Sequence, residues 1–287
     1  MIASNPFLMG AVAYDPKVVT IWNGFRARLV ARGLPFDYLL YSNYERQVED
    51  LLAGHIHAAW NSPLAWVRAR RLADASGVAV RPLVMRDTDC DLTSVVVVRA
   101  GAGITAPEQL RGRVVGVGAV DSPQATLLPL AHLHALGLHA GRDVQVRRFD
   151  VGVGLHGDHV GGERDAARAL VRGEVDAACL IDGNHLQFTQ EGILPPGATR
   201  VLAQTGTYDH CNMTIGPAAP PALADQFGEL LGAMDYADAE VRPLLDLEGL
   251  HAWRQGRTSG YRNLEAAVDL FHFYAADGRV DADDYRP

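Results

Sequence analysis

The stretch TSVVVVRAGAGITAPEQLRGRVVGVGAVDSPQAT, residues 93–126, determines the fold class. Its four consecutive valines predict a strand over 92–100 that is buried on both faces. A short helical segment over 104–112 follows, then a second apolar strand over 113–119, and then Ser122 followed by proline. Serine before proline is typical of a helix start, because serine caps the free N–H groups and proline has no N–H to leave unpaired. The order strand, helix, strand, helix predicts an α/β structure.

The same alternation extends along the chain in both directions. Before this stretch, we expect strands at 7–14, 35–42, 56–62 and 78–87 and helices at 16–34, 43–55 and 63–77. After it, we expect strands at 143–150, 175–183, 199–206 and 211–217 and helices at 122–137, 162–174, 221–236, 239–249 and 263–278. Two such series predict two α/β lobes.

Composition excludes several classes of function. The 287 residues are 48% hydrophobic and carry a formal net charge of -8, with no long basic run. We therefore expect no nucleic-acid partner. Three widely spaced cysteines without a CxxC pair argue against a disulfide framework and a zinc ribbon.

The first residues show no basic segment followed by an apolar core, and no run approaches the ~18 apolar residues of a membrane helix. We expect no direct insertion into a membrane. As written, the sequence predicts a cytoplasmic protein, or an extracytoplasmic one if a signal was removed.

Three stretches resemble a known family. They are residues 51–69 (LLAGHIHAAWNSPLAWVRA), 92–129 and 169–183 (ALVRGEVDAACLIDG). They are similar to the substrate-binding proteins of phosphate and phosphonate ABC transporters, and the resemblance covers roughly residues 7–220.

The resemblance implies a type 2 periplasmic-binding fold, with two lobes that are each a mostly parallel sheet flanked by helices. Lobe one comprises residues 1–97 and 210–287, and lobe two comprises residues 98–209. The hinge strands are expected at 93–100 and 212–217. Such lobes close over a ligand by hinge motion. An ABC permease is implied as a partner if the protein is exported.

Ligands of open α/β sheets bind beyond the carboxyl ends of strands, where helix N-termini present free N–H groups. Polar side chains lie at many of these places, and the loop over 150–161 adds two histidines. The residues expected to contact a ligand are Tyr14, Tyr44, Asn61, Ser62, Thr93, Ser94, Ser122, His156, His159 and Asp182. Ser122 fits a simple N-cap equally well, and the neighbouring Asp121 disfavours a doubly charged anion.

His156 and His159 allow three interpretations. They contact the ligand directly, as hydrogen-bond donors or cations near neutral pH. Alternatively they bind a transition metal together with His210, because imidazole suits Zn, Cu and Ni, although this spacing outside a helical HExxH context is a weak signal. The third interpretation is a solvated loop. We predict no cofactor and keep the metal as the alternative.

Two functions remain open. The resemblance predicts a solute-binding protein that closes on a small polar or anionic ligand without turnover. The alternative is an enzyme on the same scaffold, a decarboxylase or hydrolase acting on a small acid, since a fold does not determine function. In that case His156 or His159 is the acid–base catalyst and Asp182 orients it. Cys211 is then either a nucleophile or a small buried apolar group.

Overall fold

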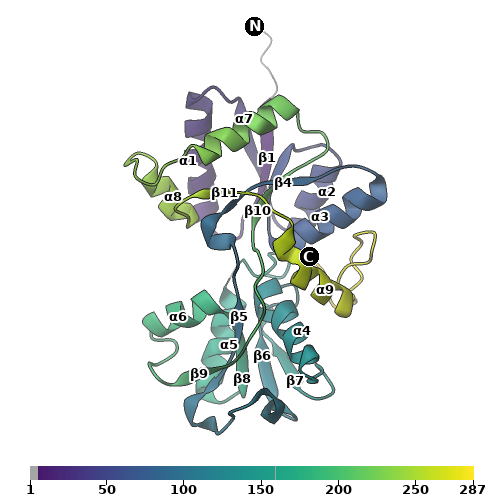
Figure 1. Cartoon of the computed structure of the whole chain (residues 1–287), viewed down its shortest axis with the longest axis vertical. Helices are drawn as coiled ribbons and strands as arrows, with labels where there is room; N and C mark the ends of the chain where they lie inside the picture. The colour runs from purple at the N-terminus through teal and green to yellow at the C-terminus, as the bar shows by residue number, and fades with distance from the viewer. Residues whose placement is uncertain (1–5, 159) are drawn as a thin grey trace.

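The computed structural model describes residues 6–158 and 160–287, and its chain forms two α/β lobes stacked along the long axis of the molecule (Figure 1). Lobe one contains a six-stranded sheet in the order β11-β4-β10-β3-β1-β2. Its strands are β1 (Phe7–Val12), β2 (Phe36–Tyr41), β3 (Ala58–Asn61), β4 (Arg81–Arg86), β10 (Asn212–Ile215) and β11 (Trp253–Gln255).

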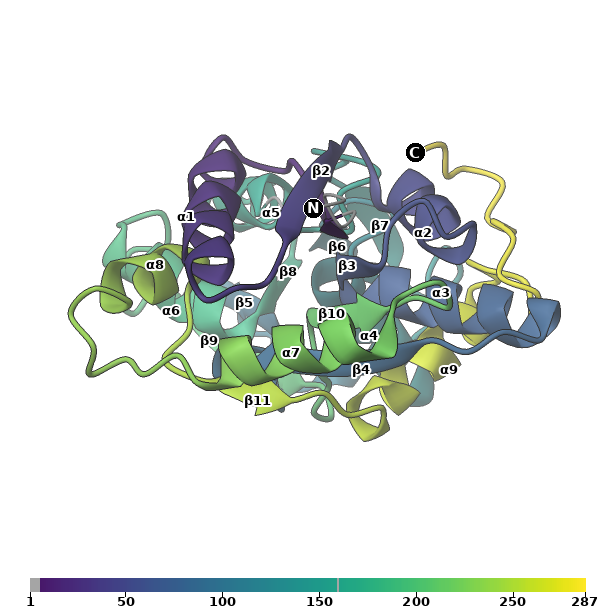
Figure 2. The same cartoon turned by 90° about the horizontal axis from the view of Figure 1, so that it is seen from above.

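The helices associated with lobe one are α1 (Lys17–Ala31), α2 (Tyr44–Leu52), α3 (Pro63–Ser76), α7 (Pro221–Gly232), α8 (Arg242–Glu248) and α9 (Arg262–Leu270). Seen from above, α1 and α2 lie on opposite sides of β2 (Figure 2). One buried cluster joins the sheet to α1, α7 and α8, and another joins it to α2 and α3. Both faces of the sheet are therefore covered.

Lobe two contains a five-stranded sheet in the order β7-β6-β8-β5-β9. Its strands are β5 (Ser94–Arg99), β6 (Val114–Val117), β7 (Gln145–Arg148), β8 (Ala177–Ile181) and β9 (Thr199–Gln204), and its helices are α4 (Leu128–Ala135), α5 (Gly161–Arg172) and α6 (Asp182–Gln190). Short helical turns are η1 (Asp87–Asp89), η2 (Ala100–Ala102), η3 (Pro107–Leu110), η4 (Pro123–Leu127) and, in lobe one, η5 (Ser259–Tyr261). Val95 and Val97 pack on the α5 face, and Val96 and Val98 pack on the opposite face, so the predicted doubly buried strand is confirmed.

The predicted two-lobed fold is confirmed, but both sheets are mixed rather than mostly parallel. The reason is that β10 runs antiparallel to β3 and β4, and β5 runs antiparallel to β8 and β9. The predicted hinge strands also do not cross between lobes, because β5 lies wholly in one sheet and β10 in the other. The chain crosses through residues 87–93 and 205–211, which pair at Leu92 and Tyr208. Lobe two thus begins with β5 at Ser94, not at residue 98.

The helix predicted over 122–137 starts with a wider turn. Ser122 Oγ accepts a hydrogen bond from the N–H of Ala125 (3.2 Å), as expected for an N-cap, and η4 is a π-helical turn. Pro129 has no N–H to donate to the carbonyl of Ala125 four residues earlier. That oxygen instead accepts from the N–H of Gly118 (3.1 Å), which ties the turn to the end of β6.

Three elements differ from the predicted pattern. The helix expected over 263–278 ends at Leu270, and His272 takes a left-handed φ of 50° that a helix cannot continue. The sequence pattern did not indicate α6, which buries only Phe188, or β11, which is three residues long.

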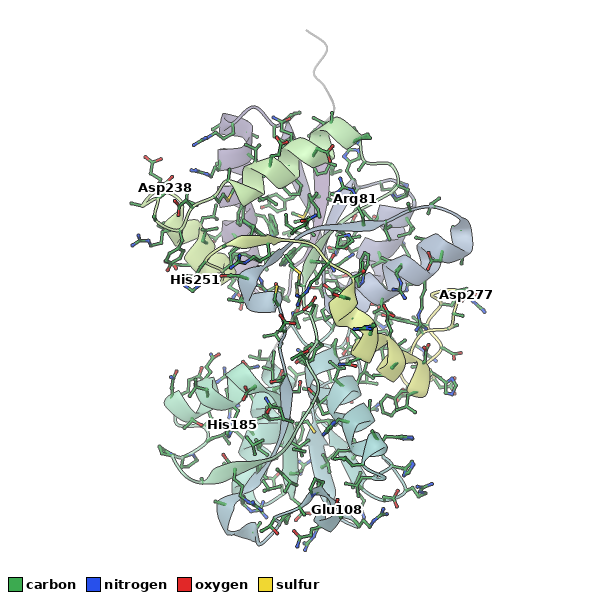
Figure 3. All side chains as sticks on the ribbon, in the orientation of Figure 1. Arg81, Glu108, His185, Asp238, His251 and Asp277 are labelled. Atoms are coloured by element: carbon green, nitrogen blue, oxygen red, sulfur yellow. The ribbon has the colours of Figure 1, made fainter. Side chains whose placement is uncertain are left out.

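The C-terminal segment, α9 with residues 271–287, packs against both lobes. Its Leu264 and Phe273 belong to one buried cluster with Trp66 of α3 in lobe one and Leu128 of α4 in lobe two. Figure 1 shows α9 between the lobes on this side, and Asp277 of the same segment is labelled next to it in Figure 3. An apolar core therefore joins the lobes here, and the assignment of 210–287 to lobe one alone is incomplete.

Leu264→Ala is expected to lower the free energy of unfolding by about 2–5 kcal/mol, because this fully buried side chain lies in the cluster that joins the lobes. Urea denaturation followed by tryptophan fluorescence measures the change. Leu186→Ala is the control, since Leu186 is 62% exposed and its truncation is expected to change stability by less than about 0.5 kcal/mol. Equal losses in the two variants would contradict the shared core.

Candidate functional site

A cavity of about 460 Å³ lies between the lobes. Its lobe-one wall comes from the segment after β1, the first turn of α1, the end of β3 and the turn η1. Its lobe-two wall comes from η4, from Gly157, Asp158, Val160 and Glu163, and from the junction of β8 with α6. In Figure 1, α1, α8 and α6 lie on the side of the molecule opposite α9. The cavity is therefore open where the apolar core between the lobes is absent.

Arg86 is the partly buried cation of the lobe-one wall. Its Nε and Nη2 donate to the two carboxylate oxygens of Asp89 (2.6 and 2.9 Å), and Nη1 lies 3.4 Å from Glu248 Oε1. Burial opposes ionisation, but Asp89 raises the pKa of Arg86 well above its usual range. Burial also opposes ionisation of Asp89, yet Arg86 and His210 lower its pKa to about 2. Burial raises the pKa of Glu248 to about 7. Two carboxylates already share this guanidinium.

Glu163 and Gln124 supply buried polar groups to the lobe-two wall, each 3% exposed. Glu163 Oε2 accepts from the N–H of Ile181 (3.0 Å) and the amide of Asn184 (2.9 Å), and Gln124 Nε2 donates to the carbonyl of Gly157 (2.8 Å). Their other oxygens have no hydrogen-bond partner among the described residues. Burial raises the pKa of Glu163. Such buried acceptors are unfavourable unless a donor reaches them.

Asp158 lies between the lobes at the inner end of the cavity. Its Oδ2 accepts a hydrogen bond from the hydroxyl of Tyr44, and its Oδ1 lies 4.0 Å from Cys211 Sγ. Burial raises the pKa of Asp158. Burial also raises the pKa of the Cys211 thiol, and Asp158 adds to that effect.

Carboxyl groups outnumber permanent cations along the cavity. The walls carry three carboxylates, on Asp89, Asp158 and Glu163, and two permanent cations, on Lys17 and Arg86. Because Arg86 already pairs with Asp89, the lining favours a ligand or ion that brings positive charge.

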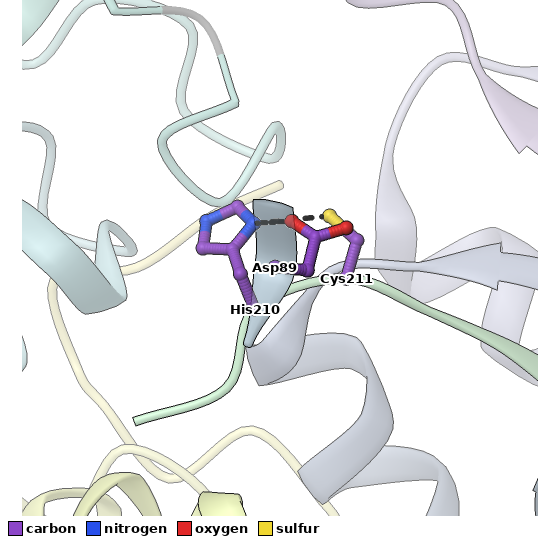
Figure 4. A group of neighbouring side chains, drawn as sticks. All are labelled: Asp89, His210 and Cys211. Carbon is purple, nitrogen blue, oxygen red and sulfur yellow. Dashed lines mark hydrogen bonds and ion pairs between the residues drawn. The ribbon is translucent and has the colours of Figure 1, made fainter. Parts of the chain in front are cut away.

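Asp89, His210 and Cys211 form a compact group at the cavity wall (Figure 4). His210 Nδ1 lies 3.1 Å from Cys211 Sγ and 3.5 Å from Asp89 Oδ1. The backbone N–H of His210 also donates to the carbonyl of Asp89 (2.8 Å). All three residues are buried.

His156 joins the two lobes. It lies in the loop between β7 and α5, is fully buried, and places Nδ1 2.6 Å from Ser62 Oγ and Nε2 2.9 Å from Glu45 Oε1. Tyr44 stacks on the imidazole with ring centroids 4.8 Å apart. Burial opposes the charge of His156, but Glu45 and Asp121 raise its pKa above the usual value. In the same way burial opposes ionisation of Glu45, but His156 lowers its pKa to about 2. This ion pair attaches a loop of lobe two to lobe one.

The backbone of this loop is fixed as well. The carboxylate of Asp121 accepts from the N–H groups of Gly154 (2.6 Å) and His156 (3.1 Å). Gly157 has a φ of +75°, and a Cβ at this position would lie 2.4 Å from Ser122 Oγ. Only glycine fits there without moving the cap of η4.

The predicted ligand-contact residues separate into two groups. Tyr14 lines the cavity, and burial raises the pKa of its hydroxyl, which stays a neutral donor. Tyr44, Asn61, Ser62, Ser94, Ser122 and His156 are buried and hydrogen-bonded within the protein. Thr93 accepts from the amide of Gln204 (2.8 Å) and Asp182 is exposed, and neither lines the cavity. His159 lies outside the described residues.

The structure does not bring together the residues that the enzyme and metal alternatives require. Asp182 does not orient His156, whose ring nitrogens face Ser62 and Glu45. His156 is not part of a potential metal-ligand group in the described chain, whereas His210 is, with Asp89 and Cys211 as neighbours. Cys211 lines the cavity and also packs on the core of lobe one.

Sequence reasoning missed most of the charged lining. Glu163 was detectable, because it falls on the same face of α5 as the buried Ala166, Ala167 and Leu170. A carboxylate on an apolar helix face needs a partner or a function. Arg86 ends β4 just before an aspartate-rich turn, which is a weaker signal.

Comparison with known proteins identifies the family. Residues 11–261 match the family described as ABC transporter, phosphonate, periplasmic substrate-binding protein. The chain belongs to this family. The prediction of a solute-binding protein that takes a small polar or anionic ligand between two lobes is confirmed. Membership in a periplasmic family supports the extracytoplasmic alternative and not the cytoplasmic one.

Solved structures of low sequence identity share the fold of this phosphonate-family protein. PhnD1 from Prochlorococcus marinus, in complex with methylphosphonate, is 15% identical with a TM-score of 0.68, over 93% of this chain and 99% of that chain. XAC2383 from Xanthomonas citri, bound to ATP, is 17% identical with a TM-score of 0.69, over 93% and 98%. The periplasmic aliphatic sulphonate binding protein SsuA from Escherichia coli is 16% identical with a TM-score of 0.57, over 94% and 92%.

A curated relative, the bifunctional protein GlmU of Methylococcus capsulatus, is 28% identical over 151 residues. The match covers 51% of this chain and 30% of the length of that protein. Across the described residues of the phosphonate-family protein, no helix is long and apolar enough to cross a membrane.

Glu45→Gln is expected to lower the free energy of unfolding by about 3–5 kcal/mol near pH 6, because it leaves a buried imidazolium without its carboxylate. The raised pKa of His156 means that its contribution is complete below the ordinary histidine pKa and is lost as pH rises through the raised value. The lowered pKa of Glu45 means that its contribution is lost as pH falls toward about 2. The difference in the free energy of unfolding between wild type and Glu45→Gln is therefore expected to become smaller at both low and high pH.

Urea denaturation at a series of pH values measures this difference. Glu229→Gln, at an exposed position of α7, is the control and is expected to change stability by no more than about 0.5 kcal/mol. A difference that is independent of pH would contradict an ion pair between the lobes.

Proposed function

We propose that this protein binds a small zwitterionic ligand, an organic phosphonate that also carries a protonated amine, and delivers it to an ABC permease outside the cytoplasm. Family membership supports the transport role and the phosphonate class. PhnD1, a structure with the same fold, contains methylphosphonate. The amine is inferred from the lining of the cavity.

The observation that carries the proposal is the pair of buried acceptors in the lobe-two wall. Glu163 Oε1 and Gln124 Oε1 lack partners among the described residues, and both side chains line the cavity. A protonated amine brings up to three N–H donors and one positive charge, and it satisfies both acceptors while offsetting the acidic lining. Asp158 adds a further carboxylate nearby.

The oxyanion end needs a different part of the cavity. Lys17, at the first turn of α1, is exposed and lines the cavity together with Tyr14. An ammonium and a neutral hydroxyl suit an oxyanion. The helix starts at Ser62 and Ser122 are less suitable, because their own side chains already cap them.

A bare dianion fits the cavity poorly. Three wall carboxylates repel it, and Arg86 is already engaged by Asp89 and Glu248. The carboxylate of Asp121 is already used by the loop around His156. These features favour a ligand of low net charge over inorganic phosphate.

Calorimetric titration with an aminoalkylphosphonate and with the alkylphosphonate that lacks the amine tests the proposal. The aminoalkylphosphonate is expected to bind at least about tenfold more tightly, since a hydrogen bond to a charged group contributes about 1.5–3 kcal/mol. Glu163→Gln is expected to remove most of this preference, because the amide keeps the size of the side chain but loses its charge.

Glu174→Gln, an exposed glutamate of lobe two, is the matched control and is expected to leave both affinities unchanged. Equal affinities of the wild-type protein for the two phosphonates would exclude recognition of the amine by the cavity. Binding of neither compound would exclude the phosphonate class.

A further inference from the structure

The geometry around Asp89, His210 and Cys211 points to a divalent transition-metal site, and we propose that it takes Zn²⁺. This inference is independent of the organic ligand, because the three side chains belong to the protein and are already together without one. The group offers a carboxylate oxygen, an imidazole nitrogen and a sulfur, a donor set that suits zinc.

The spacing of the donor atoms fits one metal centre. With Zn–N and Zn–O bonds of about 2.0 Å and a Zn–S bond of about 2.3 Å, tetrahedral ligand atoms lie about 3.3–3.6 Å apart. His210 Nδ1 lies 3.1 Å from Cys211 Sγ and 3.5 Å from Asp89 Oδ1, and all three donor atoms lie within 4.8 Å of one another. Figure 4 shows the three side chains directed toward one another. Both Asp89 oxygens also accept from Arg86 (2.6 and 2.9 Å), so the ion would take a second lone pair of Oδ1 and share this carboxylate with the guanidinium.

The charge around the group also favours a cation. Asp89 and Glu248 are both next to the single guanidinium of Arg86, and Asp158 Oδ1 lies 4.0 Å from Cys211 Sγ. Three acidic side chains and one permanent cation therefore lie around the group. A bound dication offsets this excess and stabilises the Cys211 thiolate, and the thiol proton is released to solvent on binding.

Three protein ligands leave the fourth tetrahedral position open, as in zinc sites that bind water or a substrate oxygen. Because all three residues line the cavity, that position faces the space between the lobes. The ligands also come from both crossing segments, since Asp89 lies in residues 87–93 and the other two in residues 205–211. A bound ion would cross-link the two segments where they enter lobe one.

Titration of reduced, chelator-treated protein with Co²⁺, followed by Zn²⁺, tests the site. We expect one equivalent of Co²⁺ to bind with a thiolate-to-cobalt charge-transfer band, and Zn²⁺ to displace it. Cys211→Ser and Cys211→Ala are expected to lose the charge-transfer band. They are also expected to weaken Zn²⁺ binding at least about tenfold, because loss of a residue that only hydrogen-bonds to a metal ligand already has an effect of that size. His210→Gln is expected to weaken binding similarly.

Cys90→Ser is the matched control, because Cys90 is the neighbouring free thiol and is partly exposed. Cys90→Ser should keep the band and the affinity. Circular dichroism identifies which Cys211 variant is folded, and that variant decides the test. Absence of the charge-transfer band in the wild type would overturn the proposal. A band that Cys90→Ser removes, or Zn²⁺ binding that persists unchanged in Cys211→Ala and His210→Gln, would also overturn it.

Discussion

A buried imidazolium–carboxylate contact between His156 and Glu45 organises the space between the lobes. The histidine comes from a loop of lobe two and the glutamate from a helix of lobe one, so neither lobe completes this contact alone. Hydrogen bonds to the remaining polar atoms offset the cost of burying such a pair. Ser62 supplies one to the ring, Asp121 accepts from the loop backbone, and Tyr44 stacks on the imidazole. Glu45 Oε2 and Asp121 Oδ1 have no hydrogen-bond partner among the described residues. As a result, polar groups at strand ends and helix starts hold the lobes together and are not free for a ligand.

The ion pair and the apolar cluster around α9 determine where a cavity can form. The ion pair joins the lobes through α2, and the apolar cluster joins them through α3 and the C-terminal segment. Tyr274 and Tyr285 link the two contacts, because their hydroxyls lie close to Glu45 and His156. On the opposite side, between α1 and α6, the described residues form no such cluster between the lobes, and the cavity lies there. Its wall is lined by groups with incomplete partners, such as Glu163 and Gln124. Unpartnered buried acceptors also lie near the ion pair, at Glu45 and Asp121, but those of Glu163 and Gln124 belong to side chains that line the cavity, where a ligand can reach them.

The sequence was sufficient for the fold because periodicity and turn chemistry are local. The valines of β5 and the Ser-Pro start at Ser122 predicted the elements that the structure contains. The connections between the lobes were predicted at the wrong residues, because the pairing of strands such as β5 with β8 depends on contacts between residues far apart in the sequence. The site was predicted less well for a related reason. The sequence does not show whether a polar residue such as Asn61 or His156 contacts a ligand or another side chain. The structure shows that Asn61 is hydrogen-bonded to Thr214 and His156 to Glu45.

The cavity and the crossing segments are physically coupled. Asp89, His210 and Cys211 lie at the cavity wall, and they also belong to the two chain segments that any rotation of one lobe against the other must bend. A cation bound near Arg86 would change the electrostatic energy of the cavity and would also restrain the two crossing segments. The charge balance there therefore affects both ligand recognition and movement of the lobes. The loop around His156 restrains such movement on the far side. Any opening is then expected to separate α1 from α6, on the side where the cavity lies.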